Sequence, residues 1–163
     1  MWLLWIGSVA LAGEGLPSRW QEPNVVVGVG AGRPALISVR AEAWLSSQFS
    51  AEFGFGVPAI GFDELAGDFT LRFRPDALCV GCGGQDLLTF GFGVAGVGTA
   101  VRGFDEWALA IGPDVAVTGV HWFTPELGVH ATVRGGLGPS LVSPSANVEA
   151  VDWWSFGVLG LSF

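Results

Sequence analysis

The chain has 163 residues, about the length of one domain. Only 13% of the residues are charged, about half of the roughly 25% expected of a soluble domain, whereas 50% are hydrophobic. This composition excludes a disordered chain, which needs low hydrophobicity and high net charge. The net charge is −8 and the seven cationic residues are all arginine, so we expect no binding to nucleic acid.

The first segment of the chain is apolar but too short to cross a membrane as a helix, which needs about 20 residues. It is typical of a secretory signal, and Ala10-Leu11-Ala12 suits cleavage before Gly13. A buried N-terminal strand or helix is the alternative. We predict a signal peptide over 1–12, an N-terminal tail over 13–23 and a β-barrel domain over 24–163.

After residue 23, apolar residues alternate with small or polar ones, which is the period of strands with two unlike faces. In 49–57, for example, Phe53 and Phe55 share one face and Glu52 lies on the other. The pattern predicts eight strands, over about 24–32, 35–46, 49–57, 68–74, 87–98, 107–123, 127–137 and 148–163.

The connections between these strands alternate between short and longer, as in membrane barrels. We expect loops near 33–34, 58–67, 98–106 and 138–147, and turn-like connections at 46–48, 75–86 and 124–126. Pro113 falls inside the sixth strand and predicts a bulge or a break there.

One face of the strands is rich in glycine and other small residues, which suit the inside of a narrow eight-stranded barrel. The opposite face carries large apolar residues, including Phe53, Phe55, Phe90 and Phe92. Seven arginines and fifteen acidic residues give too little polar surface to wet such an exterior. We therefore predict an all-β, eight-stranded antiparallel up-and-down transmembrane β-barrel.

These strands and the C-terminal segment together resemble the small outer-membrane β-barrel proteins of the OmpA/OmpX type, over roughly residues 23–163. In that family a last strand that ends in Phe, after apolar residues at alternate positions, is the signal for the barrel assembly machinery. Leu159, Leu161 and Phe163 match this signal. The resemblance implies location in the bacterial outer membrane and contact with its lipid, and we expect a monomer.

Tryptophans lie at or near several strand ends, where membrane barrels carry aromatic girdles. They are Trp44, Trp107, Trp122, Trp153 and Trp154. A place in an ordinary core is the alternative for these side chains.

Charged residues on the inward face predict ion pairs. If Leu45 pairs with Phe49 across the 46–48 turn, Glu42 lies opposite Glu52 inside the barrel. Two facing carboxylates repel each other, so they need cationic partners. Candidates for these partners are Arg40 and Arg72.

A second register argument starts from Phe123 opposite Leu127, which places Asp114 diagonal to Arg134. We predict a structural plug of lumen ion pairs, which argues against a water-filled pore. Its members are Arg40, Glu42, Glu52, Arg72, Asp114 and Arg134.

Neither His121 nor His130 has a serine in the local arrangement that a lipid A deacylase would need, so we predict no catalytic residue. Cys79 and Cys82 form a C-x-x-C that is only half of a zinc site. In an oxidising periplasm we predict a disulfide between them, with free thiols or a metal site as alternatives. A glycine-rich stretch over 28–32 precedes Pro34 and a strand instead of a helix, so we expect no cofactor.

The function expected from these observations is that of an integral outer-membrane barrel with a structural or surface-interaction role and a plugged, non-conducting lumen. Acidic loops with an aromatic residue, over 61–64 and 102–106, could meet an extracellular protein partner or a divalent cation. The alternatives are a soluble or periplasmic barrel that binds an apolar ligand, and a lipid-modifying enzyme.

Overall fold

A computed structural model describes residues 25–46, 48–58, 64–75, 78–80, 86–101, 106–124, 127–142 and 152–163. The predicted signal peptide over 1–12 and tail over 13–23 lie outside these residues and stay predictions. Within the described ranges, no helix has the length and hydrophobicity to cross a membrane.

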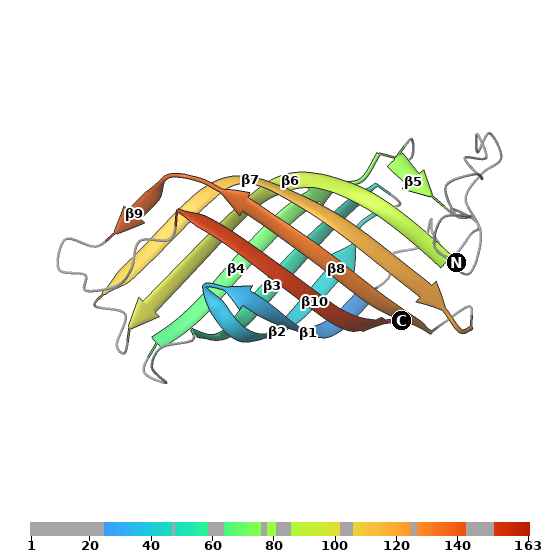
Figure 1. Ribbon diagram of the computed structural model, residues 1–163, viewed down its shortest axis with the longest axis horizontal. Coiled ribbons are helices and arrows are strands. Elements are labelled where there is room, and N and C mark those ends of the chain that lie inside the picture. Colours follow the sequence, from blue (N-terminus) through green and yellow to red (C-terminus); the bar gives the residue numbers. More distant parts are fainter. Residues whose placement is uncertain are drawn as a thin grey trace, which may run out of the picture.

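The described residues form one sheet of ten strands, and eight of the strands close into an antiparallel barrel (Figure 1). β10 closes the ring by pairing with β1. The two short strands extend the wall: β5 pairs with β6, and β9 pairs with β7. The strands are β1 (Val25–Arg33), β2 (Ala35–Trp44), β3 (Phe49–Pro58), β4 (Glu64–Phe73), β5 (Cys79–Val80), β6 (Asp86–Val101), β7 (Trp107–Trp122), β8 (Gly128–Leu137), β9 (Ser140–Val142) and β10 (Trp153–Ser162). The predicted eight-stranded barrel architecture is confirmed.

Side chains alternate between the lumen and the exterior along the strands, except at an irregularity near the start of β2, where Leu36 and Ile37 are both exposed. On β3, Phe53 and Phe55 are 60% and 59% exposed, whereas Glu52 beside them is 3% exposed. Phe90 and Phe92 on β6 also face outward. The predicted inside-out polarity is therefore confirmed: large apolar side chains cover the exterior and charged side chains lie inside.

Several predicted strand boundaries differ from the structure: β6 spans 86–101 instead of 87–98, and the short strands β5 and β9 lie in the predicted connections 75–86 and 138–147. β4 begins at Glu64, four residues before the predicted start at 68, so the connection before it is shorter than expected. The reason is that β6 continues to Val101 and offers Glu64 a pairing partner. β10 begins at Trp153, whereas the predicted strand began at 148; residues 148–151 lie outside the described part of the chain.

Pro113 neither breaks nor bulges β7, which corrects the prediction. β7 pairs with β6 through this position, where Pro113 lies opposite Val94. The interruption is on the opposite side of β7. Residues 114–122 of β7 pair with β8 and residues 108–110 pair with β9, so residues 111–113 pair with neither of these two strands. A proline has no N–H to donate, so a gap in the ladder of hydrogen bonds accommodates it.

Two glycines of β6 lie in contrasting surroundings. A Cβ atom at Gly93 would lie 2.1 Å from the carbonyl oxygen of Leu71 on β4. A Cβ atom at Gly96 would meet nothing closer than Cγ1 of Ile111, at 3.9 Å. The close approach of β4 and β6 therefore requires glycine at position 93 and not at position 96.

We expect Gly93→Ala to lower the free energy of unfolding by about 1–3 kcal/mol, because backbone must shift to admit the methyl group. Gly96→Ala is the matched control on the same strand and should change the free energy by less than about 0.5 kcal/mol. Urea unfolding followed by tryptophan fluorescence measures both. Equal effects of the two variants would contradict the requirement for glycine at 93.

Candidate functional site

The middle of the lumen contains eight charged side chains, which we call the lumen ion cluster. All are buried, and cations and carboxylates are equal in number. The members are Arg40, Glu42, Glu52, Asp68, Arg72, Arg74, Asp114 and Arg134. They come from β2, β3, β4, β7 and β8, with Arg74 just after the end of β4.

Glu42 and Glu52 lie directly opposite each other on β2 and β3, so the register predicted from the 46–48 turn is confirmed. Arg72 contacts both carboxylates, with Nη1 3.3 Å from Oε1 of Glu42 and Nη2 3.0 Å from Oε2 of Glu52. Arg74 also donates to Oε1 of Glu42, and the Ser50 hydroxyl donates to that oxygen at 2.6 Å. The guanidinium groups thus offset the repulsion between the facing carboxylates.

Other ion pairs cross the lumen between distant strands. Arg40 on β2 contacts Oδ2 of Asp68 on β4 at 2.6 Å. Arg134 on β8 pairs with the same aspartate and lies 3.4 Å from Asp114 on β7. Arg72 on β4 also lies 3.4 Å from Asp114. The cluster therefore connects β2 and β4 to β7 and β8 on the opposite side of the barrel.

Two members of the cluster, Asp68 and Arg74, are absent from the predicted set. Alternation along the strand could have identified both, because each lies an even number of positions from the inward residue Arg72. Asp68 was at the predicted start of its strand, and Arg74 at its end, where the inward direction is least secure.

Aromatic rings border the ion cluster. Phe156 contacts two guanidinium groups, with its ring centre 3.9 Å from Cζ of Arg40 and 4.8 Å from Cζ of Arg134. The Trp154 indole N–H donates to Oδ2 of Asp114 at 3.0 Å. Such cation–π contacts attract a guanidinium to an aromatic ring, and this attraction offsets part of the cost of burying the charge beside an apolar layer.

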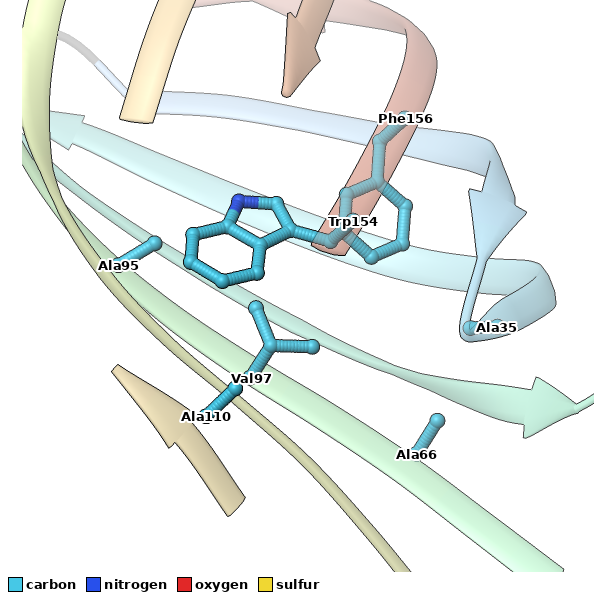
Figure 2. Packing of buried hydrophobic residues seen from close by; sticks show 7 residues of the cluster. All are labelled: Ala35, Ala66, Ala95, Val97, Ala110, Trp154 and Phe156. Carbon is cyan, nitrogen blue, oxygen red and sulfur yellow. The ribbon is translucent and has the colours of Figure 1, made fainter. Parts of the chain in front are cut away.

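An apolar layer continues from these rings toward the end of the barrel that carries the β1–β2 and β6–β7 connections. Figure 2 shows the Trp154 and Phe156 rings together, with the Val97 side chain directed toward Trp154. Small side chains surround them: Ala35, Ala66, Ala95 and Ala110. A second buried cluster of Leu87, Val120 and Trp122 lies toward the opposite end. Apolar clusters thus lie on both sides of the ion cluster along the lumen.

The predicted aromatic girdle is wrong for three of the five tryptophans, and the other two have the outward direction that a girdle needs. Trp107 and Trp153 are 40% and 46% exposed, but Trp44, Trp122 and Trp154 are buried in the lumen. Position along the strand explains this difference, because Trp44 shares the inward parity of Glu42. A position near a strand end is not enough to predict that a tryptophan faces outward.

The two histidines occupy unlike environments. His130 is 2% exposed, and its Nε2 lies 3.5 Å from Oε2 of Glu42 and 3.4 Å from the Thr132 hydroxyl. His121 lies at the rim, where its Nδ1 is 2.7 Å from Oδ1 of Asp86. Within the described part of the chain, no group of three or more histidine, cysteine, aspartate or glutamate residues is placed to hold a metal ion.

The C-x-x-C motif is described only in part. Cys79 begins β5, which pairs with β6, and Cys82 lies outside the described residues. We predict that denatured protein without reductant shows no reactive thiol and that reductant releases two, because the envelope is oxidising. Thiol titration measures this, and two reactive thiols before reduction would contradict the disulfide.

The last strand, β10, lies between β1 and β8 and ends at Ser162, one residue before Phe163. Leu159, Leu161 and Phe163 all face outward, at 58%, 45% and 59% exposure. Phe163 also exchanges backbone hydrogen bonds with Val25, which fastens the C-terminal residue to β1. Their role as an assembly signal stays a prediction.

Comparison with known proteins bears on the fold. No family model matches the sequence, and no curated protein matches it significantly. Among solved structures, the N-terminal β-barrel domain of Pseudomonas aeruginosa OprF superposes with a TM-score of 0.50 at 12% identity, over 87% of this chain and 100% of that domain. The fold is that of a small outer-membrane β-barrel. Ail, the attachment invasion locus protein of Yersinia pestis, matches with a TM-score of 0.49 at 10% identity, over 88% of this chain and 99% of its own.

Proposed function

We propose that this chain is an integral protein of the bacterial outer membrane, with a structural or surface-interaction role and a lumen that conducts no ions. The observation that carries the proposal is the polarity of the wall. Large apolar side chains on every barrel strand face outward, among them Val29 (59% exposed), Phe53 (60%) and Val133 (70%).

A soluble barrel would have the reverse arrangement. Soluble monomers rarely expose contiguous apolar patches larger than a few hundred Å². Lipid-facing apolar side chains that alternate with lumen-facing polar ones are typical of outer-membrane barrels. A soluble barrel that binds an apolar ligand would also need apolar space inside, and the middle of this lumen contains the lumen ion cluster instead.

The fold also supports an orientation in the membrane. The start of β1 and the end of β10 lie at one end of the barrel, beside the β2–β3 turn (Figure 1). Outer-membrane barrels have short turns at the periplasmic end and longer loops outside. The proposal therefore places both barrel termini in the periplasm and the connections over 59–63 and 102–105 outside the cell.

Fractionation tests the membrane location. We expect the protein to stay with the envelope after a carbonate wash, to need detergent for extraction, and to migrate differently on a gel when heated. A soluble periplasmic protein of similar size is the control, and the carbonate wash should release it. Release by carbonate without detergent would refute the proposal and favour the soluble alternative.

Dense filling of the lumen supports the absence of conductance. Arg72, Asp114 and Arg134 are each at most 2% exposed in the middle of the barrel, and Trp154 and Phe156 fill the layer above them. Planar-bilayer recordings of purified protein should show no ion channel, with a known porin as the positive control. Regular single-channel openings would contradict a plugged lumen.

The proposed role is one of surface interaction and not of catalysis. The described ends of two connections carry acidic residues on either side of Val101: Glu64 pairs with Val101, whose N–H donates to the Glu106 carbonyl at 2.9 Å. An acidic outer rim of this kind suits a protein partner with a basic surface, or a divalent cation. His130 is buried against Glu42 in the lumen, away from any surface that lipid substrates reach.

A further inference from the structure

We propose that a groove in the outer face of the barrel wall binds one acyl chain of a phospholipid with an ammonium head group. The groove has a volume of about 460 Å³ and lies toward the end of the barrel that carries the β6–β7 connection. It follows β6 over 96–100, a length of about 13 Å. The inference rests on the proposed membrane location, because the ligand comes from the surrounding lipid. The floor and sides include Gly67, Phe69, Gly96, Gly98, Trp107 and Leu109.

The floor of the groove consists of glycines that lie side by side on neighbouring strands. Gly67 on β4 pairs with Gly98 on β6. Large apolar side chains flank this pair, because Phe55 on β3 lies opposite Gly67 and Leu109 on β7 lies opposite Gly98. The two glycines therefore form a channel between two higher rows of side chains.

The channel continues along β6 on both sides of the glycine pair. Toward the middle of the wall, Gly96 lies between Phe69 on β4 and Ile111 on β7. Val94, the next outward residue of β6, is 57% exposed and closes this end. Toward the rim, the groove ends beside Trp107. Its long and narrow form suits an extended chain.

The barrel itself does not require glycine at the floor of the groove. A Cβ atom at Gly96 would meet no atom closer than 3.9 Å, and one at Gly67 no atom closer than 3.7 Å. Gly93 on the same strand is different, because its Cβ atom would lie 2.1 Å from the carbonyl oxygen of Leu71. Glycine weakens the interior of a strand and often marks a place where a ligand approaches the backbone closely. The open floor therefore points to an occupant outside the barrel.

A lipid chain is the occupant that the surroundings favour. The groove is continuous with the apolar wall, since its sides include Phe55, Phe69 and Trp107, which are 59%, 37% and 40% exposed. A hydrocarbon chain in the channel gains van der Waals contacts with the floor and with both sides, and it has no polar group to satisfy. A second copy of the barrel fits less well, because each copy has a net charge of −8 and the two would repel each other.

The charge at the rim selects the head group. Glu106 directly precedes Trp107, which lines the outer end of the groove, and Glu64 begins the neighbouring strand β4. Over 59–64 and 102–106 the sequence contains four acidic residues and one arginine, a formal charge of −3. This charge attracts an ammonium group and repels an anionic head group. The ligand class is therefore phosphatidylethanolamine, with one chain in the groove and the ammonium group toward the acidic rim.

Native mass spectrometry of the folded protein in detergent tests the proposal, with palmitoyl-oleoyl phosphatidylethanolamine as the probe. We expect each barrel to retain one molecule of this lipid after the detergent is removed. Phosphatidylglycerol with the same chains should bind about two- to fivefold less, as for the loss of an exposed ion pair. Absence of retained phosphatidylethanolamine, or equal retention of the two lipids, would overturn the proposal.

Variants that fill the floor show whether the groove holds the lipid. Gly96→Leu should abolish retention, and Gly67→Leu decides the question if Gly96→Leu does not fold. Gly119→Leu is the matched control and should retain the lipid, because Gly119 has similar room for a Cβ atom and does not line the groove. Unchanged retention in Gly96→Leu, or equal losses in Gly96→Leu and Gly119→Leu, would contradict the site. A dimer that disappears in Gly96→Leu would assign the groove to a second copy and overturn the lipid.

These outcomes are distinguishable from failure of the membrane location. A barrel that stays with the envelope after the carbonate wash but retains no lipid would contradict the groove alone. Release by carbonate without detergent would contradict the membrane location on which the groove depends.

Discussion

Replacing Arg72 by methionine should lower the free energy of unfolding by about 3–5 kcal/mol, because it leaves buried carboxylates without their shared cation. The Arg72 guanidinium contacts Glu42 at 3.3 Å, Glu52 at 3.0 Å and Asp114 at 3.4 Å. Its side chain is 1% exposed, so water cannot replace these contacts. Urea unfolding of the folded barrel in lipid vesicles measures the loss.

Arg33→Met is the matched control for this prediction. Arg33 ends β1 at the rim, where Cζ lies 4.6 Å from the centre of the Trp153 ring. Loss of such a contact costs about 0.5–1 kcal/mol. Addition of Asp114→Asn to Arg72→Met should recover part of the stability, since it removes one of the orphaned charges. If Arg72→Met lowers the free energy of unfolding by less than about 1 kcal/mol, the lumen ion cluster does not stabilise the barrel as expected.

Substituting arginine for Phe53 should lower the free energy of unfolding from a bilayer by about 2–4 kcal/mol, because the charge would lie in the apolar part of the membrane. Phe53 lies near the middle of β3 and is 60% exposed. Leu45, beside the β2–β3 turn, is 61% exposed and lies at the end of the barrel. Leu45→Arg should therefore cost only about 0–1 kcal/mol.

This pair of variants separates a membrane barrel from a soluble one. Exposure is nearly the same at the two positions, and the Phe53 ring also contacts the Phe69 ring at 4.8 Å, so in water Phe53→Arg would cost more than Leu45→Arg only by about 0.5–1.5 kcal/mol. Depth in a bilayer is what distinguishes them. A difference between Phe53→Arg and Leu45→Arg in vesicles that is no larger than about 1.5 kcal/mol, the value of the lost ring contact, would contradict a membrane-spanning wall.

The alternation of residue types was sufficient to predict the barrel and the direction of most side chains. A strand has a period of two, so one inward residue fixes the direction of all others on that strand. The short turn before Phe49 fixed the register of β2 on β3, and hence the opposition of Glu42 and Glu52. Such local constraints are fully contained in the sequence.

Contacts across the lumen could not be predicted in the same way. The pairing of Arg134 with Asp68 joins residues of β8 and β4, which are not neighbours in the sheet. Which side chain reaches which partner depends on the diameter of the barrel and on the stagger of its strands. The insertion of Trp154 between Val97 and Asp114 depends on the same quantities.

The lumen ion cluster has no net formal charge, so the net negative charge of the protein lies on residues outside it. Of seven arginines and fifteen acidic residues, four of each belong to the cluster, so the three remaining arginines and eleven acids account for the net −8. These residues belong to the tail, the connections and the rims. Neighbouring copies should therefore repel one another through their water-facing ends, over about 30 Å at 0.01 M salt but only about 10 Å at 0.1 M. Lateral crowding in a membrane would then depend on ionic strength even though the wall itself is uncharged.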